Sequence, residues 1–89
     1  MVIIDVSDIR DHRQLHAVLR DSLDFPSFYG MNWAAFWDAI TGLVDMPDHL
    51  RFTGWSDLTK HLPEEADHLR RSLDDFRSQY QAGFVTEYR

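Results

Sequence analysis

Residues 28–38 read Phe-Tyr-Gly-Met-Asn-Trp-Ala-Ala-Phe-Trp-Asp, a run that places five aromatic side chains in eleven positions. The run lies in a window from Asp21 to Asp48 that holds five Asp and no Lys, Arg or His. Because the window itself contains no cation, it favours a surface that meets a positively charged partner. We therefore expect a binding surface here and not a reaction centre of the protein's own.

The composition bounds the class of protein. We expect a single domain spanning residues 1–89, and the hydrophobic fraction of 44% excludes a disordered tail. The chain has no cysteine, which excludes a disulfide scaffold, a thiolate metal site and a cysteine nucleophile. The first residues lack the basic start and long apolar segment of a signal peptide, and no apolar run could span a bilayer, so we expect a cytoplasmic protein.

The charge balance of the whole chain also favours a positively charged partner. Fifteen acidic residues against nine Lys and Arg give a formal net charge of −6. Nucleic acids and anionic membranes bind through Lys and Arg, so we expect neither as a partner. Mild acidity alone is also explained by solubility, and it is the clustering of the Asp residues that favours a basic partner.

Strand-like and helix-like segments alternate along the chain. We expect strands at 2–6, 49–53 and 84–88, and helices at about 12–24, 33–45, 56–61 and 63–82. Strands separated by helices indicate an α/β domain with a three-stranded parallel sheet and three to four helices. Asp11 and Gln14 have the spacing of a capping box, Ser56 is expected to cap the short third helix, and Gly83 to end the last one.

The helix expected at 33–45 has two distinct sides. Its apolar side holds Trp33, Phe36, Trp37, Ile40, Leu43 and Val44. A neighbouring stripe holds Ala34, Asp38, Thr41 and Asp45. Trp and Phe at helical spacing are usually core, and Asp on the other face is usually only solvated. Against this alternative, three aromatics within five residues exceed what one short helix can bury, which is typical of binding anchors.

The segment Phe28–Pro47 carries a pattern of an aromatic pair, Gly-x-Asn, Trp-Asp, Thr-Gly, an acid and then Pro. The residues that keep it are Tyr29, Gly30, Asn32, Trp37, Asp38, Thr41, Gly42 and Pro47. In this pattern the chain resembles the barstar family, intracellular inhibitors of secreted bacterial ribonucleases of the barnase type. The first strand, the first helix and Phe76-Arg77 ahead of Gly83 also fit the family's layout, so the resemblance covers nearly the whole chain.

The resemblance implies a barstar-like fold and an inhibitor, not an enzyme, that is a monomer when free and binds its ribonuclease 1:1. In the family, the second helix and the loop before it plug the ribonuclease active site. The Asp after the Trp, here Asp38, takes the place of a substrate phosphate and accepts charge-assisted hydrogen bonds from the enzyme. The expected partner-binding residues are Phe28, Tyr29, Gly30, Asn32, Trp33, Trp37, Asp38, Thr41, Gly42, Leu43 and Asp45. Within this set, Asn32, Trp37, Asp38 and Thr41 are expected to face outward, while Phe36 and Ile40 hold the helix to the core.

Three positions depart from the family's prototype. Ala34 and Ser78 stand where the prototype has interface acids, and Leu43 stands where it has Trp. The departures favour the same inhibitor fold with a different or re-tuned partner. Candidates for replacement charge are Asp45, Asp74 and Asp75. The alternative is an interaction or regulatory module that uses this fold against a non-ribonuclease partner.

No cofactor and no metal site are expected from the sequence. The acidic and histidine residues close together in the chain are His61, Glu64, Glu65, Asp67 and His68. Metal sites need three or four converging ligands, so we expect a solvated surface there. The other histidines, His12, His16 and His49, are scattered. The chain shows no nucleophile elbow and no Gly-rich phosphate loop, so no catalytic residue is expected.

Overall fold

The computed structural model describes residues 1–89, and its elements follow the predicted order. They are β1 (Val2–Asp5), α1 (His12–Leu23), α2 (Trp33–Asp38), the π-helical segment η1 (Ala39–Leu43), β2 (His49–Thr53), α3 (Trp55–His61), α4 (Pro63–Gln79) and β3 (Val85–Tyr88). The strands form one sheet in the order β1-β2-β3, and both pairs are parallel. The predicted α/β class with a three-stranded parallel sheet is confirmed.

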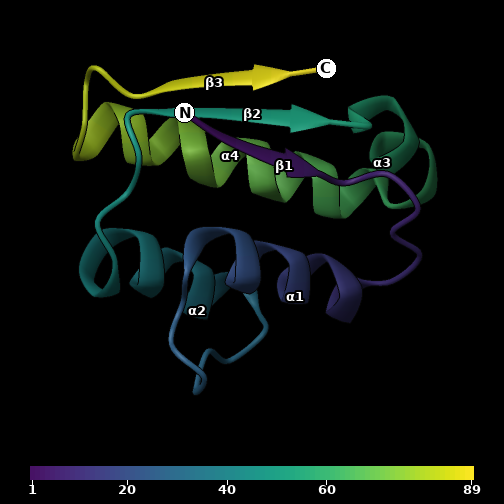
Figure 1. Ribbon diagram of the computed structural model, residues 1–89, viewed down its shortest axis with the longest axis horizontal. Helices are drawn as coiled ribbons and strands as arrows, with labels where there is room; N and C mark the ends of the chain where they lie inside the picture. Colours follow the sequence, from purple (N-terminus) through teal and green to yellow (C-terminus); the bar gives the residue numbers. More distant parts are fainter.

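Figure 1 shows how the helices are arranged around this sheet. Helix α4 runs alongside the strands, and α1 and α2 lie together on the β1 side, away from β3. Strand β2 is central, and Leu50 and Phe52 on it are fully buried. Leu15 of α1 and Leu69 of α4 are also fully buried, so the core lies between the sheet and these helices. None of the helices has the length and apolar character needed to cross a bilayer.

The start of α1 follows the predicted capping residues with one change of partner. The Asp11 carboxylate accepts a hydrogen bond from the Gln14 backbone N–H at 2.8 Å. The Gln14 side-chain oxygen accepts from the backbone N–H of Arg10, one residue before the cap, at 2.7 Å. Asp24 ends the helix in the left-handed conformation, with φ 61°. This capping fixes where α1 begins, and His12 and His16 lie in its first two turns.

The helix predicted at 33–45 is shorter and changes character along its length. A regular α-helix ends at Asp38 and continues as a π-helical turn over residues 39–43. The Thr41 hydroxyl donates to the Trp37 carbonyl at 2.6 Å, and Gly42 favours helix weakly, which suits a widened turn. Phe36 and Ile40 are buried, as predicted for the side that holds this helix to the core.

The predicted start of α3, the predicted end of α4 and the predicted start of β3 were wrong. Helix α3 begins at Trp55 behind Gly54 and has no side-chain cap, so Ser56 does not cap it. Gly54 is left-handed at φ 73°, and a Cβ there would lie 2.7 Å from the backbone nitrogen of Ser7. Helix α4 ends at Gln79, before Gly83. Strand β3 starts at Val85, because the backbone N–H of Phe84 donates to the Gln81 carbonyl in the preceding turn.

The edge strand β3 is held to β2 by a carboxylate. Glu87 lies opposite Arg51 in the strand register, and Arg51 Nε donates to it at 3.2 Å. His49 and Arg89 also hydrogen bond to this carboxylate. Partial burial raises the pKa of Glu87, but the hydrogen bonds from His49, Arg89 and Arg51 outweigh it and lower the pKa from 4.5 to about 2.

This pKa shift predicts how stability depends on pH. Between about pH 4.5 and pH 2 the unfolded chain protonates Glu87 while the folded chain does not, so the free energy of unfolding falls as the pH falls. Glu87→Gln should reduce that slope, which denaturant unfolding at a series of pH values would measure. Glu64→Gln, at an exposed position on α4, is the matched control. Equal slopes in the two variants would contradict the assignment.

Candidate functional site

The loop before α2 is anchored to α1 by a buried hydrogen bond. Tyr29 is buried, and its hydroxyl lies 2.5 Å from His16 Nδ1. The same hydroxyl lies 3.5 Å from the carbonyl of Asn32, and the Tyr29 ring packs on Phe25 with centroids 4.8 Å apart. Burial raises the pKa of Tyr29 above its usual value, so the phenol stays neutral and can donate. Of the predicted partner-binding residues, Tyr29 is therefore mainly an anchor of the loop.

Asn32 fixes the start of α2. Its side-chain oxygen accepts from the Ala35 N–H at 2.7 Å, and its amide nitrogen donates to the Gly30 carbonyl at 3.1 Å. This is an N-cap that also closes the loop behind it. Asn32 is exposed, as predicted, but its polar atoms bond within the chain. A Cβ at Gly30 would lie 3.2 Å from the Ala35 Cβ, so the absence of a side chain lets the loop lie against the helix.

Five of the predicted residues meet at one hollow on the surface. We call it the Asp38 hollow; it has a volume of about 180 Å³ and is lined by Phe28, Tyr29, Gly30, Ala35, Asp38 and Leu43. Phe28 is 75% exposed and Leu43 is 51% exposed, which is unusual for large apolar side chains. Apolar side chains left uncovered beside a carboxylate are typical of a protein-binding surface.

Asp38 is an exposed carboxylate without a cation of its own. No Lys, Arg or His of the chain lies within 4.0 Å of it. Asp21, another acid of the same window, is instead paired with Arg20 at 2.9 Å. Gly42 and Asp45 are also exposed, on η1 and just after it. The end of α2 thus presents unneutralised negative charge between apolar side chains.

Two predicted tryptophans are turned partly inward. The Trp33 indole N–H donates to Glu65 at 2.7 Å, and its ring stacks on His68 with centroids 4.9 Å apart. Trp37 is half-buried, and its ring meets Tyr80 edge-on with centroids 5.8 Å apart. Phe36 is buried, whereas both indoles stay partly exposed, with Trp33 against His68 of α4 and Trp37 against Tyr80, the residue after α4. Thr41, also expected to face outward, is half-buried and bonds to backbone.

Tyr80 is a surface residue next to this site that sequence reasoning did not identify. It is 58% exposed, although it lies four residues after the buried Phe76, at the spacing of the apolar side of this helix. Its ring stacks on Phe76 and supports Trp37. Its position in the sequence could have revealed this exposure. The last residue of an apolar stripe lies at a helix end, where fewer neighbours cover it.

The histidines of α1 are not scattered, which corrects the sequence prediction. His12 and His16 are four residues apart on one face, and their ring centroids are 4.4 Å apart. Both lie near Glu65 of α4, whose carboxylate lies 3.0 Å from His12 Nδ1. The hydrogen bond to Glu65 raises the pKa of His12, whereas burial lowers the pKa of His16 to about 4. The His-x3-His spacing in the sequence could have revealed this pairing.

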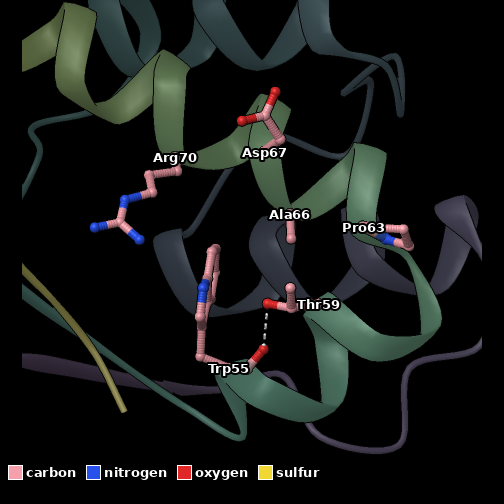
Figure 2. A pocket seen from close by; sticks show the side chains of 6 residues that line it. All are labelled: Trp55, Thr59, Pro63, Ala66, Asp67 and Arg70. Carbon is pink, nitrogen blue, oxygen red and sulfur yellow. Dashed lines mark hydrogen bonds between the residues drawn. The ribbon is translucent and has the colours of Figure 1, made fainter.

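A second hollow lies between α3 and α4 and contains none of the predicted residues. Figure 2 shows its six lining side chains, with the Thr59 hydroxyl bonded to the carbonyl of Trp55. Arg70 lines it as well, and its guanidinium lies 4.4 Å from the centre of the Tyr88 ring. The carboxylate of this hollow, Asp67, is paired with Arg71 at 2.9 Å, so the hollow lacks the unpaired carboxylate of the Asp38 hollow.

Two comparisons relate the chain to known proteins. A family model described as Barstar (barnase inhibitor) matches residues 1–88. A protein of Bacillus subtilis (strain 168) named "Putative ribonuclease inhibitor YrdF" is 50% identical over 46 residues, which is 52% of this chain. The match covers 50% of that relative, so the similarity spans half of its length. Because the family model covers the chain to its penultimate residue, this protein belongs to the barstar family.

Proposed function

We propose that this protein inhibits a barnase-type secreted bacterial ribonuclease by covering its active site in a 1:1 complex. The observation that carries the proposal is the unpaired, exposed carboxylate of Asp38 beside Phe28 and Leu43. An enzyme that binds RNA phosphates has a cationic cleft, and a carboxylate can occupy a phosphate position by accepting its hydrogen bonds. The family assignment and the printed name of the Bacillus relative support the same function.

The surroundings of Asp38 make that interaction strong. The apolar side chains of Phe28 and Leu43 exclude water once the partner is in place. The loss of water strengthens the charge-assisted hydrogen bonds that Asp38 accepts from the partner. Tyr29 and Asn32 hold the loop in one conformation before binding, so less conformational entropy is lost on association. The net charge of −6 attracts a basic partner and speeds the encounter.

Two of the candidates for the charge missing at Ala34 and Ser78, Asp74 and Asp75, lie on different sides of α4. On α4, His68 stacks on Trp33, so the stripe that contains His68 faces α2. Asp75 lies seven residues further, two turns along that stripe. Asp74 lies four residues after Arg70, on the stripe that contacts Tyr88 of β3. Asp75 is therefore better placed than Asp74 to extend the acidic surface beside α2.

Removing the Asp38 carboxylate should weaken binding by about 2–5 kcal/mol, because the partner's cations would be left desolvated and unpaired. The measurement is calorimetric titration of Asp38→Ala against the ribonuclease encoded by the same organism, with residual nuclease activity as a second readout. Asp21→Ala removes the same charge from the same window and is the matched control. A loss below about 1 kcal/mol, or an equal loss in the control, would place the binding site elsewhere.

Neutralising Asp75 should slow association and weaken binding by up to about 1 kcal/mol, since it lies at the rim of the proposed interface. Asp74→Asn changes the net charge by the same amount as Asp75→Asn at the adjacent position, and it should have the smaller effect on the association rate. Stopped-flow association rates at low ionic strength would compare the two. A larger effect of Asp74→Asn would show that α4 does not face the partner through its α2 side.

Ala34 and Ser78 favour a second candidate, an interaction module for a partner that is not a ribonuclease. The two candidates differ in what the Asp38 surface captures from host extract. The ribonuclease proposal expects wild-type protein, but not Asp38→Ala, to retain a nuclease. Retention of a different protein with the same dependence on Asp38, together with no inhibition of the host's ribonuclease, would favour the second candidate.

A further inference from the structure

The residues His12, His16 and Glu65 form a cluster outside the Asp38 hollow. One possible ligand atom from each of the three residues lies within 4.8 Å of the other two. The two imidazoles come from one face of α1, and the carboxylate comes from α4. Residues far apart in sequence therefore bring two nitrogen ligands and one oxygen ligand together.

His16 leaves one ring nitrogen without a partner. The residue is 0% exposed, and Nε2 has no hydrogen bond. Its other nitrogen, Nδ1, lies 2.5 Å from the Tyr29 hydroxyl. In the tautomer that carries its proton on Nδ1, His16 donates to the Tyr29 hydroxyl, the hydroxyl donates to the Asn32 carbonyl, and the lone pair lies on Nε2. A buried lone pair without a donor loses hydrogen-bond energy, which a bound cation would restore.

Each of the other two candidate ligands is also held by a neighbour. His12 Nε2 lies 2.9 Å from the Met31 carbonyl, which fixes Nε2 as the protonated nitrogen and turns Nδ1 toward Glu65. The Trp33 indole N–H donates to the Glu65 carboxylate at 2.7 Å. Outer hydrogen bonds of this kind orient ligands in known metal sites, where a ligating imidazole donates its second N–H to a carbonyl.

We propose that His12, His16 and Glu65 form a binding site for a divalent transition metal of the Zn²⁺ type, through His12 Nδ1, His16 Nε2 and a Glu65 oxygen. Imidazole and carboxylate ligands suit Zn²⁺ and Co²⁺, whereas Mg²⁺ and Ca²⁺ prefer sites made of oxygen alone. The set of three protein ligands leaves a fourth tetrahedral position for water.

The three ligand atoms lie within 4.8 Å of one another, so side-chain movement has to bring them to the spacing of a metal site. Ligand bonds near 2.0–2.1 Å place two ligand atoms of a tetrahedral site roughly 3.3–3.5 Å apart. The His12–Glu65 separation of 3.0 Å is already close to this spacing. The side chains of His12 and Glu65 are 44% and 25% exposed, so they can adjust toward the buried His16. The metal would replace the proton shared by His12 and Glu65.

Calorimetry of the full chain with ZnCl₂ tests the site. We expect one Zn²⁺ per chain with micromolar or tighter affinity, and no heat with MgCl₂. His12→Gln and Glu65→Gln should each weaken Zn²⁺ binding at least tenfold, as expected when a ligand is removed. His61→Gln and Glu64→Gln are matched controls, because they remove the same groups outside the cluster. Neither control should change the affinity by more than about twofold.

His16 is tested without mutation, because a change at this buried position can prevent folding. In ¹H–¹⁵N spectra of the imidazole rings, Zn²⁺ should shift His16 Nε2 and leave Nδ1 protonated. The Co²⁺ form should show the visible absorption of a tetrahedral site. Absence of Zn²⁺ binding up to millimolar concentration would overturn the proposal. Binding that survives His12→Gln and Glu65→Gln, or that leaves His16 Nε2 unshifted, would show an adventitious surface ion and overturn it equally.

Discussion

The buried hydrogen bond between His16 and Tyr29 is the interaction on which the rest of the site depends. It joins α1 to the loop before α2, and the same hydroxyl lies beside the carbonyl of Asn32, the residue that caps α2. Because both side chains are buried, neither can exchange this bond for one with water. The position of α2, and with it that of Asp38 at its end, therefore follows from a polar contact inside the core.

In the proposed function, the loop and α2 divide their side chains between anchoring and binding. Phe36 is buried, and Trp33 is tied to α4 through Glu65, so the inner face of α2 is held from two sides. Phe28 and Leu43 remain uncovered beside Asp38, although burying them within the chain would stabilise the monomer. Leaving them exposed is consistent with a surface completed only by a partner. A rigid support behind an exposed apolar surface lowers the conformational cost of binding a protein partner.

The sequence was sufficient for features set by local pattern. Strand β2 lies at the predicted 49–53, and Asp11 caps α1, because alternation and capping depend on neighbours in the chain. The sequence was insufficient for features that depend on contacts between residues far apart in the chain. Gly54 starts α3 in contact with Ser7, and Trp33 pairs with Glu65 across 32 residues. Helical periodicity alone cannot show which aromatics α4 covers.

The central claim is that the loop and α2, held by α1 and α4, form the face that meets the partner. Hydrogen–deuterium exchange with and without the ribonuclease of the same organism tests it most directly. The account predicts added protection concentrated at residues 28–45, with the amides of β3 unchanged. Protection centred instead on the hollow between α3 and α4, around Trp55 and Arg70, would contradict it.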